Sequence, residues 1–94
     1  ANTSKVSTSQ FASGSIIEGQ VANSVLSRNI HVHKDSLVKD SILFPRVVIG
    51  EGAQVEYAIL DKGVEVADGV VIRGTAEHPV VVKKGAKVTE DIHS

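Results

Sequence analysis

The stretch that decides the fold is residues 21–71, which divides into three blocks of seventeen residues: VANSVLSRNIHVHKDSL, VKDSILFPRVVIGEGAQ and VEYAILDKGVEVADGVV. Within each block the aliphatic positions are separated by 5, 6 and 6 residues. A helical face needs separations of three and four, so this spacing argues against helices. Hydrophobic positions that recur about every six residues are typical of a parallel β-helix. The aligned columns are Val21, Val38, Val55 and Ile72; Leu26, Leu43 and Leu60; and Val32, Ile49 and Val66.

The positions two places before these aliphatic columns support the same fold. Side chains of a strand alternate between its two faces, so these positions also point into the coil. They are small or apolar, as expected for a narrow interior. Their columns are Ser24, Ser41 and Ala58; Ser36, Ala53 and Val70; and Ile30, Val47 and Val64.

The pattern extends to both sides of the three blocks. Val6, Phe11 and Ile17 continue it backwards as a tighter coil, and Val80 begins a short strand after a loop over residues 73–79. We therefore expect one domain of about four coils with a C-terminal return strand over residues 6–88. We expect residues 1–5 to be a lead-in and residues 89–94 to be a frayed tail.

Composition limits the classes of function. The 94 residues carry a net charge of −1, which argues against a nucleic-acid partner. The chain has no cysteine, so disulfides and thiolate metal sites are excluded. No apolar run approaches the roughly 20 residues of a membrane span, and no signal peptide is recognisable. We expect a cytoplasmic location, and the missing start methionine suggests a piece of a longer protein.

One outward-facing column is apolar. Val25, Ile42 and Ile59 alternate with the inward leucines and are predicted to lie one above the other on the outside, with Phe44 close by. An apolar patch on a surface usually marks an interface. We expect these four residues to contact another domain or subunit, and an isolated domain to self-associate.

Two segments carry a family resemblance. The runs SIIEGQVANSVL (15–26) and KDSILFPRVVIGEGAQVEYAILDKGVEVADGVVI (39–72) resemble the C-terminal β-helix domain of bacterial ADP-glucose pyrophosphorylase, also called glucose-1-phosphate adenylyltransferase. The tail GTAEHPVVVKKGA (74–86) is similar to the non-catalytic partner subunit of some Gram-positive bacteria. Left-handed winding is implied by this resemblance alone.

The resemblance implies a parent enzyme that makes ADP-glucose and pyrophosphate from ATP and glucose 1-phosphate for glycogen biosynthesis. Catalysis and Mg²⁺ would belong to an N-terminal nucleotidyltransferase domain, so no catalytic residue, metal or cofactor is expected in this chain. The β-helix domain would dock on that domain, build a homo- or hetero-tetramer, and contribute to allosteric regulation by anionic effectors.

Basic residues gather near one predicted corner. Arg28, Arg46 and Lys62 lie there on three successive coils, where they can form a positive strip suited to phosphate groups. The resemblance places effector-binding basic residues near the NSVL coil, and His31 stands where a catalytic-type subunit tends to have Arg. We predict that Arg28, His31 and Arg46 contact a sugar-phosphate effector or the partner domain.

The histidines leave other functions open. His31 and His33 flank the inward Val32 and face outward on the same side, but no third ligand at suitable spacing is evident, so no metal site is predicted. A hexapeptide-repeat acyltransferase would use one of them as general base at a trimer interface. The β-helix tail of another sugar nucleotidyltransferase, such as a mannose-1-phosphate guanylyltransferase, is a further alternative.

Overall fold

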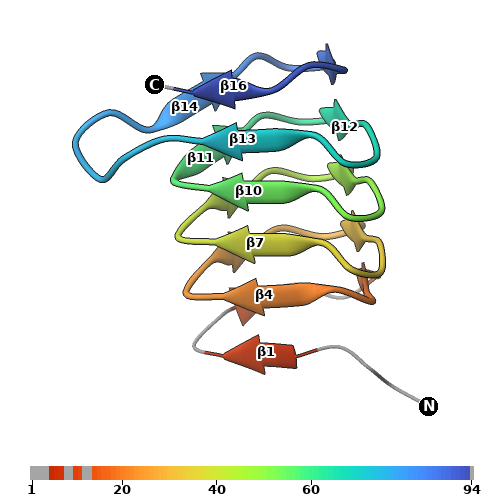
Figure 1. The fold of residues 1–94 in the computed structure, drawn as a ribbon. Coiled ribbons are helices and arrows are strands. Elements are labelled where there is room, and N and C mark those ends of the chain that lie inside the picture. The colour runs from red at the N-terminus through yellow and green to blue at the C-terminus, as the bar shows by residue number, and fades with distance from the viewer. Residues whose placement is uncertain (1–4, 8–9, 12–13, 94) are drawn as a thin grey trace.

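The computed structural model describes residues 5–7, 10–11 and 14–93, and over these residues the regular elements are sixteen short β-strands. The strands form three sheets that follow the sides of one coil (Figure 1). The first sheet contains β1 (Lys5–Ser7), β4 (Gln20–Ala22), β7 (Leu37–Lys39), β10 (Gln54–Glu56), β13 (Val71–Arg73) and β16 (Ile92–His93). The second contains β2 (Gln10–Phe11), β5 (Val25–Leu26), β8 (Ile42–Leu43), β11 (Ala58–Leu60) and β14 (Val80–Val82). The third contains β3 (Ile16–Ile17), β6 (His31–Val32), β9 (Val48–Ile49), β12 (Glu65–Val66) and β15 (Lys87–Val88).

The seventeen-residue period is the register of the sheets. Val38 pairs with Val21 on one side and with Val55 on the other, in parallel. In Figure 1 the first sheet runs leftward across the front, and the chain then passes behind and rises one level, which makes the winding left-handed. The predicted all-β, hexapeptide-type parallel β-helix is therefore confirmed.

The core is the stack of inward side chains. The three leucines of the second sheet, Leu26, Leu43 and Leu60, are buried one above another, as their column predicts. The small inward positions are buried too, and they leave room where the chain approaches a corner. The full set of buried apolar residues is Val21, Leu26, Ile30, Val32, Val38, Leu43, Val47, Ile49, Ala53, Val55, Ala58, Leu60, Val64, Val66, Val70, Ile72, Val80, Val82 and Val88.

Two buried serines at one corner satisfy the backbone around them. The Ser24 hydroxyl donates to the carbonyl of Ala22 (2.8 Å) and accepts from the backbone N–H of Ser41 (3.1 Å). The Ser41 hydroxyl repeats this pattern one coil later. It donates to the backbone carbonyl of Lys39 (2.8 Å) and accepts from the backbone N–H of Ala58 (3.2 Å). A buried hydroxyl without a partner would destabilise the fold, so these contacts explain why serine is tolerated inside.

The C-terminal end differs from the expectation of four coils and a return strand. Residues 74–79 form a loop closed by hydrogen bonds between Thr75 and His78, and it takes up the extra length. The parallel register then resumes, because Val81 pairs with Ile59 and Lys87 pairs with Glu65. The segment after residue 79 thus forms a further coil, and the described chain makes about five turns.

The last residues also continue the helix instead of fraying. β16 pairs with β13, with Ile92 opposite Ile72. The side chain of Asp91 accepts a hydrogen bond from the backbone N–H of Val71 at 2.9 Å, which fastens this strand to the coil below. The β-helix therefore extends beyond residue 88, the boundary expected from sequence. Over the described part of the chain, no helix has the length and apolar character needed to cross a membrane.

Candidate functional site

The outer face of the second sheet carries a continuous apolar row. Val25, Ile42, Ile59 and Val81 are consecutive register partners, so they lie about 4.8 Å apart up the sheet. Val25 is 50%, Ile42 42% and Val81 65% exposed, and Ile59 is half-buried. Phe44, two residues after Ile42, is 40% exposed. The predicted outward positions are correct, and their role as an interface stays a prediction.

β14 continues the second sheet as its last strand, in parallel register with β11. Val81 therefore lengthens the row, because alternation points it outward between the buried Val80 and Val82. The row, defined as Val25, Ile42, Ile59 and Val81, is not covered by any described segment of the chain.

A basic corner lies at the edge of the second sheet. Arg28, Arg46 and Lys62 line a shallow hollow of about 430 Å³ together with Asn29 and Pro45. Backbone hydrogen bonds stack the corner turns, among them Arg46 N–H to the carbonyl of Arg28 (3.2 Å). Arg46 and Asn29 occupy the same turn position on successive coils, with φ of 65° and 58°. Both are therefore in the left-handed region, which asparagine adopts more readily than arginine. Within the described residues, none of the three cations forms an ion pair with a carboxylate.

The structure does not bring the three predicted effector residues together at one place. Arg28 and Arg46 do share one hollow, as their column predicts. His31 does not line it, because His31 lies on β6 in the third sheet and directs its ring to Glu18.

The two outward histidines meet a carboxylate that sequence analysis missed. His31 Nε2 lies 3.0 Å from Glu18 Oε1, and His33 Nδ1 lies 4.0 Å from the same oxygen. The two imidazoles stack, with ring centroids 3.8 Å apart and planes 15° from parallel. The ligand atoms of all three side chains lie within 4.8 Å of one another.

A shorter first coil explains why this carboxylate is there. Ile16 pairs with His31, and Ile17 with Val32, an offset of fifteen residues in place of seventeen. Glu18 directly follows β3 and His33 directly follows β6. The same offset therefore makes them neighbours on adjacent coils. The tighter spacing of the first coil in the sequence, used as a register, predicts that Glu18 and His33 are neighbours.

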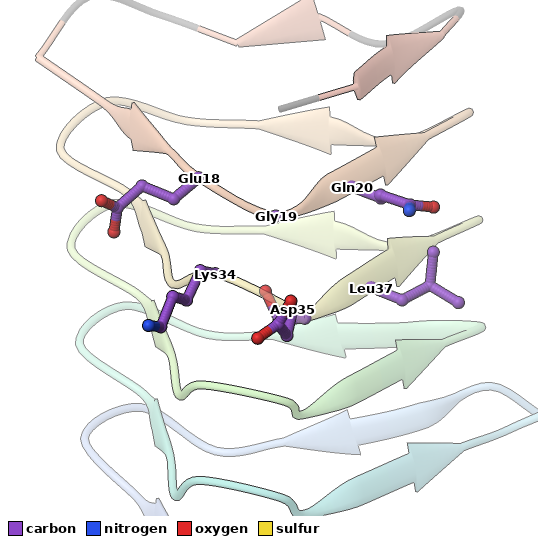
Figure 2. Close-up of a pocket in the computed structure, with 7 residues that line it drawn as sticks. Glu18, Gly19, Gln20, Lys34, Asp35 and Leu37 are labelled. Carbon is purple, nitrogen blue, oxygen red and sulfur yellow. The ribbon is translucent and has the colours of Figure 1, made fainter. Parts of the chain in front are cut away.

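Close backbone packing holds this corner. A Cβ atom on Gly19 would lie 2.4 Å from the Ser36 hydroxyl and 2.7 Å from the carbonyl of His33, so only glycine fits. The Ser36 hydroxyl in turn donates to the His33 carbonyl. The corner borders a hollow of about 500 Å³ (Figure 2), in which the Glu18 carboxylate and the Lys34 ammonium are directed to one side and Gln20 and Leu37 to the other.

The electrostatics of the group favour an ionised Glu18. The hydrogen bond from His31 is the largest cause that lowers the pKa of Glu18 below its ordinary value, and the charges of His31, His33 and Lys34 act in the same direction. Lys34 itself lies 3.8 Å from Glu51, so its nearest carboxylate is on the next coil. The Glu18 carboxylate is thus available to the two imidazoles.

Comparison with known proteins agrees with the geometry. Three parallel sheets with a hexad inward pattern define the class of hexapeptide-repeat β-helix proteins. The chain belongs to the family described as GlmU-like, C-terminal hexapeptide, whose sequence profile matches residues 1–91.

Several relatives carry one name. Glucose-1-phosphate adenylyltransferase of Hydrogenovibrio crunogenus is 43% identical over 65 residues, which cover 68% of this chain and 15% of the relative. The Bacillus cytotoxicus protein of the same name is 41% identical over 73 residues, which cover 78% of this chain and 19% of the relative. The Corynebacterium jeikeium protein is 39% identical over 84 residues, which cover 85% of this chain and 21% of the relative. The predicted resemblance is confirmed, and the matched region spans about a fifth or less of each relative.

Proposed function

We propose that this chain is the non-catalytic β-helix portion of a glucose-1-phosphate adenylyltransferase and that it serves in assembly and regulation. The observation that carries the proposal is the similarity to adenylyltransferases, at 39–43% identity over 68–85% of this chain. In the proposed enzyme, ADP-glucose formation and Mg²⁺ binding belong to a nucleotidyltransferase domain outside these residues.

The apolar row is the proposed assembly surface. Parallel sheets normally have both faces covered, and here the inner face is covered by the aliphatic stack while the outer face of the second sheet keeps its apolar side chains exposed. Four aligned side chains with Phe44 beside them form a contiguous patch, and burying such a patch is favourable in proportion to its apolar area. We assign the row to contact with the nucleotidyltransferase domain or with another subunit of the tetramer.

The basic corner is the proposed effector contact. Arg28, Arg46 and Lys62 surround one hollow, and two arginines can bind a phosphate group through several N–H donors. A sugar phosphate matches this chemistry, because it combines a charged group with hydroxyls. We keep Arg28 and Arg46 as proposed effector contacts, and we propose Lys62 as the third contact in place of His31.

The assembly role is tested by a matched pair of substitutions in the full-length protein. Ile42→Lys places a charge in the apolar row, whereas Ile16→Lys places one at a 54% exposed apolar position on the third sheet. We expect Ile42→Lys to weaken association by more than about thirtyfold, since central interface residues contribute at least about 2 kcal/mol. Ile16→Lys should leave the association unchanged. Light scattering measures the assembly, and circular dichroism checks the fold.

Activity measurements separate this proposal from its rivals. The full-length protein, alone or with its partner subunit, should form ADP-glucose from ATP and glucose 1-phosphate. A strict monomer at high concentration would contradict the assembly role. A trimer that turns over acetyl-coenzyme A would identify an acyltransferase instead, and use of GTP with mannose 1-phosphate would identify another nucleotidyltransferase.

A further inference from the structure

The cluster of Glu18, His31 and His33 has the composition of a metal site. Two imidazole nitrogens and a carboxylate oxygen are ligands that zinc-class divalent ions accept together. The three groups come from adjacent coils of the third sheet, so residues thirteen to fifteen apart in sequence become neighbours on one face. Neither the assembly surface nor the basic corner uses any of them.

The distances are close to those that one ion requires. Ligand bonds of about 2.0–2.1 Å place the donor atoms of a tetrahedral ion roughly 3.3 Å apart. Glu18 Oε1 and His31 Nε2 are already 3.0 Å apart, and Glu18 Oε1 and His33 Nδ1 are 4.0 Å apart. All three side chains are partly exposed, so small rotations can bring the donors together without moving the backbone. The stacked imidazoles must open slightly for both lone pairs to converge.

The backbone beneath the cluster is well fixed. Val32, between the two histidines, is fully buried, and the N–H groups of His31 and His33 donate to the next coil at 3.1 and 3.0 Å. Gly19 packs against the His33 carbonyl, as described above. His31 lies on β6, and Glu18 and His33 directly follow β3 and β6, so the site is built at the ends of paired strands, where residues are positioned more accurately than on loops.

Space for further ligands lies beside the cluster. A hollow of about 210 Å³ adjoins His33, because the next two residues up the sheet, Gly50 and Ala67, have almost no side chain. Three protein ligands leave a fourth position of a tetrahedral ion for water or another small ligand. The hollow provides room for it.

We propose that Glu18, His31 and His33 bind one divalent transition-metal ion, of the zinc class, on the outer face of the third sheet. Magnesium and calcium suit the site poorly, because both prefer sites made of oxygen ligands. The ion would link the segment that follows β3 to the coil that contains β6. The proposal is independent of the assembly and effector roles.

Zinc stoichiometry in the full-length protein tests the proposal. The protein is equilibrated with ZnCl2 at neutral pH, and bound zinc per chain is compared with that of Glu18→Gln, His31→Gln and His33→Gln. Each variant should lose one zinc equivalent, or bind it at least about tenfold more weakly, because loss even of a residue that only orients a ligand weakens binding about 10- to 100-fold. His78→Gln, which removes an imidazole from the loop over residues 74–79, is the matched control and should retain the ion.

Two outcomes would overturn the proposal. One is equal zinc content in the wild type and in the triple variant of the cluster. The other is loss of the same equivalent in His78→Gln. Circular dichroism of each variant checks the fold, and His33→Asn provides a second substitution should His33→Gln unfold. A zinc-dependent rise in the melting temperature of the unmodified protein, absent in the triple variant, gives a readout that requires no affinity fit.

Discussion

The outer faces of the second and third sheets share one architecture and differ in almost everything they display. Both consist of two- or three-residue strands in parallel register over the same aliphatic core. The second sheet presents Val25, Ile42, Ile59 and Val81 in a row, whereas at successive levels the third presents Ile16, His31, Val48, Glu65 and Lys87. The inward residues therefore specify the fold, and the outward residues are free to specify contacts.

This difference indicates how the chain distributes its functions. A row of aliphatic side chains is suited to a protein partner, because burial of apolar surface is not directional. A cluster of imidazoles and a carboxylate is suited to an ion, because its ligands must converge on a point. The corner between these faces, with Arg28 and Arg46, is suited to an anion.

The largest effect should come from breaking what both faces share. Leu43 is fully buried at the centre of the stack, so Leu43→Ala removes packing beneath the apolar row and toward the third sheet. We expect the free energy of unfolding to fall by about 2–5 kcal/mol, as for other large-to-small core substitutions. Urea denaturation measures it. The neighbouring Ile42→Ala, on the outside, should cost much less, and equal costs would contradict the division into inner and outer residues.

An intermediate effect should come from the corner between the faces. In the full-length enzyme, Arg28→Glu should raise the sugar-phosphate concentration needed for half-maximal activation by about tenfold. The substitution replaces a hydrogen-bond donor to the phosphate group with a negative charge that repels it. Activity titrations with and without effector measure the change. Lys39→Glu, an exposed charge reversal on the first sheet, should have no such effect. Unchanged activation in Arg28→Glu would remove the effector assignment.

The smallest effect concerns pH and the third sheet alone. Because the folded state lowers the pKa of Glu18 from its ordinary 4.5, its ionised form stabilises the protein above that value. The contribution is lost as the pH falls through the lowered pKa. We expect Glu18→Gln to lower the melting temperature by roughly one to three degrees at neutral pH, since the pair is exposed. The difference should shrink as the pH falls below 4.5. A difference that grows in acid would have the wrong sign for this mechanism.

Much of the fold was predictable because one repeat of seventeen residues specifies it. The columns of Val21, Leu26 and Val32 define one coil, and each later block repeats them in the same order. The outward direction of Val25 and Ile42 then follows from strand alternation. Arg28 and Arg46 could be placed on one corner for the same reason, because a fixed period converts sequence separation into vertical stacking.

The irregular coils were harder to predict. β16 was not predicted, and the fifth coil was predicted only as a return strand, since the offset between Ile59 and Val81 depends on how the loop over residues 74–79 closes. Glu18 was missed because its neighbours follow from an offset of fifteen and not seventeen. The tighter spacing of the first coil indicates one such change of register, but hydrogen bonding between coils decides which residues meet.

By itself, the amino-acid sequence determined the winding period, the aliphatic interior and which side chains face outward, because these depend only on strand alternation and a constant repeat. The tertiary structure alone decided which residues of unequal coils meet: Glu18 with His31 and His33, Val81 with Ile59, and Asp91 with the backbone of Val71. The physical reason is that parallel strands pair wherever their backbone hydrogen bonds and buried side chains are satisfied together, and a loop of any suitable length can deliver the chain to that register.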